Sequence, residues 1–166
     1  MVGVKKISAA ARGLLVIGAI VLLISLFLVP WFTVAGSRPE LPAGSYDGVG
    51  STELLNSLAK GPYAWIALAW LFVSAIVAIA VAAMRRRTHN FGTSGILVLI
   101  LYAILLFVAA NLVNQQASGA NASISFGYGF VAAVAGSALI EAGSRLPSPV
   151  PMKPAIPASE AGQGKL

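Results

Sequence analysis

The chain has 166 residues, of which 58% are hydrophobic and only 10% are charged, and its formal net charge is +6. Its mean hydropathy of +0.87 and its few charges exclude an ordinary soluble domain, in which about a quarter of the residues are charged. The absence of cysteine excludes disulfides, thiolate metal sites and cysteine nucleophiles. We therefore expect an all-α integral membrane protein.

Gaps between the charged residues indicate the membrane spans. A helix needs about 20 apolar residues to cross the hydrocarbon core. The longest uncharged gap, 88–140, has 53 residues, and as one helix it would be about 80 Å long, so it must fold back on itself. The pattern predicts a bundle of four transmembrane helices within a membrane domain over 13–143, at 13–34, 63–84, 94–113 and 122–141.

The first predicted helix follows a basic segment, 1–12, and is expected to end in two aromatic anchors at the membrane interface, Trp31 and Phe32. A cleavable signal peptide is the alternative, because the small residues of 34–36 suit a signal peptidase. Cleavage would leave three spans.

The loop between the first two helices, 35–62, begins with turn-forming residues. Its second half predicts a short amphipathic helix at about 51–60, capped by Ser51 or Gly50 and carrying its leucines on one face. We expect this helix to lie on the outer membrane surface and to return the chain to the bilayer. The alternative is a lid or a docking element for a partner.

The second and third helices are joined by Arg85, Arg86 and Arg87. These arginines anchor the helix ends on the cytoplasmic side, and they are also candidates for contact with an anionic lipid headgroup. Amides and small residues over 114–121 predict the turn that leads into the fourth helix.

Small residues recur on one face of the fourth helix, at Gly129, Ala133, Gly136 and Ser137. Helices in lipid associate through such faces, because small residues let two backbones approach closely. This face is expected to pack within the bundle or, alternatively, against a second copy or another membrane protein. The proline-rich tail, 144–166, is predicted to be disordered and cytoplasmic.

The distribution of Lys and Arg predicts the orientation in the membrane. With four spans, nine of the eleven cations lie on the side of the two termini, and only Arg38 and Lys60 lie on the other side. Positive charge collects in the cytoplasm, so both termini are expected there, in the inner membrane of the cell. The net charge therefore reflects topology, and we expect no nucleic acid as a partner.

The predicted spans lack the groups that intramembrane chemistry uses. Apart from Glu141, at the end of the fourth helix, they contain no ionisable side chain, whereas proton relays and ion-coupled carriers place such groups inside their spans. We therefore expect no catalytic, cofactor-binding or metal-binding residue. Asn111 and Glu141 are the most polar residues near the bilayer, and helix capping or interface solvation is the expected role of both.

The order of these features resembles that of small four-helix membrane proteins of actinobacteria, and most closely the family associated with tryptophan biosynthesis. The similar segments are 30–34, which reads PWFTV, the three arginines, and 127–130, which reads GYGF and precedes Gly136. The resemblance implies an inner-membrane protein and supplies no catalytic residue. The predicted function is that of a non-enzymatic accessory or scaffold subunit. The alternatives are a carrier or channel for a neutral or hydrophobic solute, lined by hydroxyls and Asn111, and a regulator that binds anionic lipid.

Overall fold

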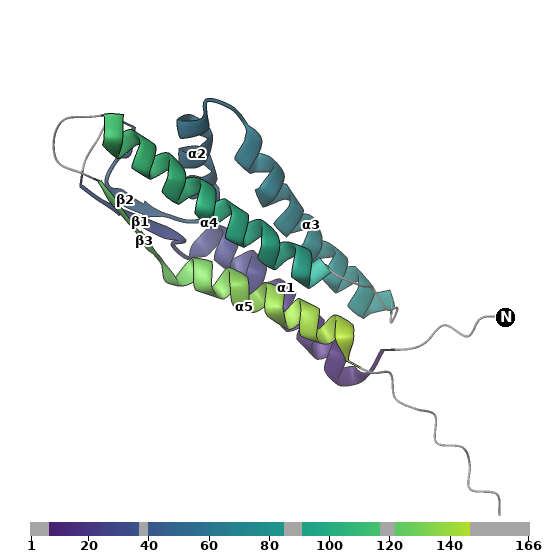
Figure 1. Ribbon diagram of the computed structural model, residues 1–166. Coiled ribbons are helices and arrows are strands. Elements are labelled where there is room, and N and C mark those ends of the chain that lie inside the picture. The colour runs from purple at the N-terminus through teal and green to yellow at the C-terminus, as the bar shows by residue number, and fades with distance from the viewer. Residues whose placement is uncertain (1–6, 37–39, 85–90, 117–121, 147–166) are drawn as a thin grey trace, which may run out of the picture.

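A computed structural model describes residues 7–36, 40–84, 91–116 and 122–146 of the chain. Four long helices run alongside one another, and a short helix and a small sheet lie together at one end (Figure 1). The elements in chain order are α1 (Ala9–Leu28), β1 (Phe32–Ala35), β2 (Gly44–Tyr46), α2 (Gly48–Ala59), α3 (Tyr63–Met84), α4 (Phe91–Gln116), β3 (Ser123–Phe126) and α5 (Tyr128–Arg145).

Three of these helices are long and apolar enough to cross a membrane: Ala9–Leu28, Tyr63–Met84 and Gly92–Leu112. The bounds of α3 match the prediction of 63–84. α4 is longer than predicted at both ends. At its C-terminal end, the polar last turn still forms helix before the chain turns.

The first helix ends earlier than predicted. The prediction extended it to residue 34, but α1 ends at Leu28 and Val29 is extended, with φ −123° and ψ 132°. The residue before a proline avoids the helical region, and Pro30 is that proline. The apolar residues that follow form β1 instead of a last helical turn.

A three-stranded antiparallel sheet, in the order β2-β1-β3, corrects the all-α prediction. Phe32 is opposite Tyr46 on one side and Phe126 on the other. The fourth helix was predicted to begin at 122, but 123–126 alternate between serine and apolar residues, which is the strand period, and form β3. α5 begins only at Tyr128.

α2 begins earlier than predicted, and the predicted cap residues are wrong. The side chain of Asp47 accepts a hydrogen bond from the Gly50 amide at 2.7 Å and caps the helix. Leu54 and Leu55 are buried by the rest of the protein, so the apolar face of α2 contacts the bundle. The helix ends at Ala59, and Lys60 caps it with a left-handed backbone, with φ 51°.

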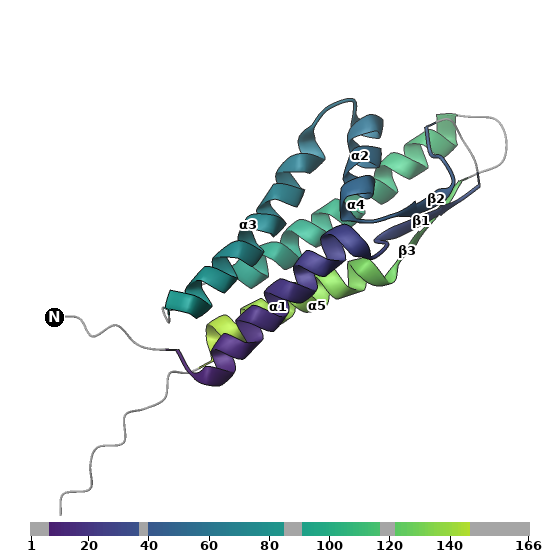
Figure 2. The same cartoon turned by 180° about the vertical axis from the view of Figure 1, so that it is seen from behind.

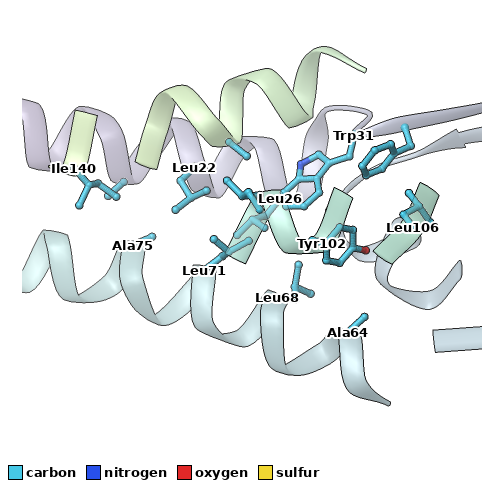
Figure 3. Packing of buried hydrophobic residues seen from close by; sticks show 14 of the residues in the cluster. Leu22, Leu26, Trp31, Ala64, Leu68, Leu71, Ala75, Tyr102, Leu106 and Ile140 are labelled. Carbon is cyan, nitrogen blue, oxygen red and sulfur yellow. The ribbon is translucent and has the colours of Figure 1, made fainter. Parts of the chain in front are cut away.

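The bundle is filled by apolar side chains. On α3, Ala64, Leu68, Leu71 and Ala75 recur at helical spacing and face the core (Figure 3). On the opposite side α1 and α5 cross at Gly18 and Gly136, where a Cβ on Gly18 would lie only 2.7 Å from the Gly136 carbonyl oxygen. Close approach of backbones is the main source of helix association in lipid, so these two helices form a close pair.

Candidate functional site

A groove of about 880 Å³ opens between α2, α3 and α4. α3 and α4 diverge toward the end at which α2 lies, and α2 fills the space between their ends (Figure 2). The lining is almost entirely apolar and aromatic, and consists of Leu55, Leu58, Ala59, Lys60, Tyr63, Ala64, Ile66, Ala67, Trp70, Val98, Leu101, Tyr102, Leu105, Val108, Ala109 and Leu112. Its volume is within the range of about 300–1,000 Å³ that is typical of ligand sites.

α2 forms the roof of the groove and is hydrogen-bonded to both of its walls, α3 and α4. The side-chain oxygen of Asn56, on α2, accepts a hydrogen bond from the Ala64 amide at 2.8 Å, in the first turn of α3. The hydroxyls of Tyr102, on α4, and Thr52, on α2, are 3.2 Å apart and hydrogen-bonded. α2 is therefore bonded to α3 and to α4, and the groove is preformed.

Tyr102 lines the groove and also packs against two aromatic residues at the start of β1, Trp31 and Phe32. It is only 2% exposed, and its ring lies edge-on to Trp31 at 5.7 Å and nearly parallel to Phe32 at 6.3 Å. The indole of Trp31 donates a hydrogen bond to the Ser25 carbonyl at 2.8 Å, and Phe32 also contacts Phe126 at 5.4 Å. Trp31 and Phe32 are fully buried, which corrects their prediction as interface anchors.

Polar groups are found near the ends of the groove. Lys60 and Tyr63 are exposed where α2 leads into α3. At Trp70, farther along α3, the indole donates to the Ser94 hydroxyl at 3.3 Å. The lining between them is largely apolar and the Trp70 indole already has a partner, which suits an elongated apolar ligand whose one polar end lies at Lys60.

The small residues predicted for helix packing are buried in α5: Gly129, Ala133, Gly136 and Ser137. A Cβ on Gly136 would lie 2.8 Å from the Gly18 carbonyl oxygen, so α1 covers this face within the chain. Ser137 faces α4, where its hydroxyl would lie 3.0 Å from a Cβ on Gly95. None of the four residues lines the groove.

The polar residues singled out in the sequence lie elsewhere. Glu141 accepts a hydrogen bond from the Thr93 amide at 2.9 Å and also pairs with Arg145, so it caps the start of α4. Asn111 is exposed on α4 and does not line the groove. Arg85, Arg86 and Arg87 lie outside the described residues. The described residues contain no group of three side chains suited to hold a metal ion.

Sequence reasoning missed the groove and its two most informative residues, Tyr102 and Lys60. Tyr102 is the only side chain with a hydrogen-bonding group between residues 96 and 110, and a hydroxyl in such a run needs a partner. That signal could have identified Tyr102. The position of α2 over the groove could not have been predicted from the sequence, because it depends on how α2 packs against α3 and α4.

Comparison of the chain with protein-family models, with curated proteins and with solved structures gives no match.

Proposed function

We propose that the chain is a non-enzymatic accessory or scaffold protein of the cell membrane, with four spans and both termini in the cytoplasm. α5 is the fourth span. It lies beside α1 along the bundle, and its 18 residues extend about 27 Å. Because α1 is a candidate span and packs closely against α5, the two helices share the same depth of the bilayer.

The ends of the elements support this orientation. The start of α1, the end of α3, the start of α4 and the end of α5 meet at one end of the bundle, opposite the sheet and α2 (Figure 1). In the sequence, nine of the eleven cations come before residue 13, between α3 and α4, or after residue 144, which is the pattern of a cytoplasmic side. Removal of 1–36 by a signal peptidase would remove α1 and the central strand, which favours retention of the segment.

The chemistry of the buried polar groups carries the proposal. Two buried serines of the spans bond to carbonyl groups of their own helix, Ser25 to Leu22 at 2.7 Å and Ser74 to Trp70 at 2.7 Å. In the part of the chain that the structure describes, the buried hydroxyl of Ser137 has no hydrogen-bond partner, and that of Tyr102 bonds to Thr52. A nucleophilic serine needs a base within hydrogen-bond reach, whereas Ser25 and Ser74 have a carbonyl there instead. The exposed position of Asn111 likewise offers no support for a lined solute path. Contact is therefore the proposed mode of action.

Native mass spectrometry of the protein, extracted from its own membrane in mild detergent, tests this proposal. We expect a complex of fixed stoichiometry, either with one other membrane protein or between copies of this chain. A monomer that carries only lipid under the mildest extraction would contradict the scaffold function.

A further inference from the structure

The groove between α2, α3 and α4 opens sideways, toward the position of the lipid. Its rim residues Ile66 and Leu101 are 73% and 57% exposed. The lining extends about 10 Å along α3, from Tyr63 to Trp70, and about 21 Å along α4, from Val98 to Leu112. These lengths bracket the thickness of one leaflet, which is about 15 Å.

The mouth of the groove has a positive charge. The backbone of Lys60 is fixed, because its amide donates to the carbonyls of Asn56 and Ser57 at the end of α2. Within the described residues, no carboxylate forms an ion pair with its ammonium group. A lysine at headgroup level attracts anionic lipid, and the exposed ring of Tyr63 suits the same depth.

We propose that the groove binds an acyl chain of an anionic phospholipid of the outer leaflet, with the phosphate at Lys60 and Tyr63. Apolar space of this kind excludes water, so a hydrocarbon chain is the occupant that its lining favours. Only the assignment of this site to the outer leaflet rests on the proposed function, because the proposed topology places α2 on the outer side of the membrane.

The shape of the walls argues against a transmembrane helix of another protein as the occupant. Helices in lipid pair through small residues, and three such glycines already meet a helix of this chain: Gly18 and Gly136 meet each other, and Gly92 meets α5 at Glu141. The groove presents large side chains such as Trp70 and Leu105 between its alanines, so its wall is uneven. A slim, deformable acyl chain can follow such a wall, whereas a rigid helix cannot approach it closely.

Substitution of either of two alanines by a larger residue is expected to fill part of the groove. Ala67 on α3 and Ala109 on α4 line its two walls and are only partly buried, so a larger side chain there extends into the groove. Ala109→Phe is the main variant and Ala67→Leu is a second, milder one. Ala135→Phe is the matched control, because Ala135 is exposed on α5 and does not line the groove.

The experiment titrates the detergent-solubilised full chain with phosphatidylglycerol, or with phosphatidylcholine, and counts bound lipid by native mass spectrometry. We expect one tight site that prefers phosphatidylglycerol. Lys60→Gln should reduce that preference about fivefold, while Arg12→Gln, which removes the same charge in the first turn of α1, outside the groove lining, should leave it unchanged. Ala109→Phe and Ala67→Leu should abolish the tight site for both lipids, and Ala135→Phe should retain it.

A second measurement does not depend on any variant. A photoactivatable phosphatidylglycerol in vesicles should crosslink to α3 and α4 peptides that contain Trp70, Leu101 and Leu105. Equal affinity for the two lipids, tight binding that survives both filling variants, or crosslinks spread evenly over exposed residues such as Ile17 and Val131 would overturn the proposal. So would crosslinking of the groove to another protein in native membranes. Loss of the scaffold complex would leave these outcomes unaffected.

Discussion

Gly18 and Gly136 lie against each other where α1 and α5 cross, and neither position has room for a methyl group. A Cβ on Gly136 would lie 2.8 Å from the Gly18 carbonyl oxygen and 2.9 Å from the Leu22 amide nitrogen, both backbone atoms. We expect Gly136→Ala to reduce the free energy of unfolding by about 1–3 kcal/mol, because the helices must separate. Thermal unfolding in detergent, followed by circular dichroism, measures this effect.

Gly13 provides the matched control for that substitution. It lies in α1, and a Cβ there would have no heavy atom within 4 Å. Gly13→Ala should therefore be neutral or should stabilise the protein by up to about 1 kcal/mol, as expected for helix propensity alone. Equal stability of Gly136→Ala and Gly13→Ala would contradict the close crossing.

Asn114 joins the end of α4 to the start of β3. Its side chain donates to the Ala122 carbonyl at 2.8 Å and accepts from the Ala122 amide at 3.1 Å. Asn114→Ala removes both bonds and should cost about 1–3 kcal/mol of stability, with faster hydrogen exchange in β3. Asn111→Ala, on the exposed side of the same helix, should change neither quantity. If both variants behave alike, Asn114 does not hold the strand.

At the scale of elements, the sheet brings together two loops that are far apart in the chain. Thr33 in β1 is opposite Ser125 in β3, and Ala35 is opposite Ser123. Because the chain contains no cysteine, introduced pairs report this register without background. We expect Thr33→Cys with Ser125→Cys to form a disulfide readily under mild oxidation, as mass spectrometry of peptides can show.

The pair Thr33→Cys with Ser123→Cys is the control for register. These positions are two residues out of register on the same face, about 7–8 Å apart, beyond the usual reach of a disulfide. Equal oxidation of the two pairs would indicate that β3 slides along β1 or that the sheet does not form.

The elements differ in how far the sequence predicts them. α3 is predicted to the residue, because Pro62 and the arginines bound a single apolar run. β1 is not, because in a membrane protein an apolar run continues smoothly from helix into strand, and only Pro30 marks the change. Its strand partners lie in other loops, so no local period reveals them. α2 was predicted as a helix, but its position depends on Thr52 and Asn56 contacting other helices.

At the scale of the whole molecule, we expect the two termini on one side of the membrane and the sheet with α2 on the other. Ser45 is exposed in β2, and Ser159 belongs to the tail. We expect a membrane-impermeant maleimide to label Ser45→Cys in intact cells and Ser159→Cys only after permeabilisation. Labelling of both from the same side would refute four spans, and the unmodified chain is the control because it has no cysteine.

The groove is a property of the whole molecule and illustrates why the candidate site could not be predicted. Its lining comes from three helices, each of which reads in the sequence as an ordinary apolar or amphipathic segment. The groove exists because α3 and α4 diverge around α2, and this divergence follows from contacts between distant residues, such as Thr52 and Tyr102. Lys60 was recognised in the sequence only as one of two outer cations.

The pairing of β1 with β3 forms late in biosynthesis, because the two strands lie far apart in the chain. The hydroxyl of Ser125 donates to the carbonyl of Thr33, 92 residues earlier in the chain, at 3.4 Å. The strand is synthesised first, and its second neighbour emerges only after α3 and α4 have been synthesised. Until then one edge of β1 is unpaired and Phe32 lacks its contact with Phe126. A chain in which β3 does not reach β1 would therefore display an open strand edge and exposed aromatic rings, which are features that promote aggregation.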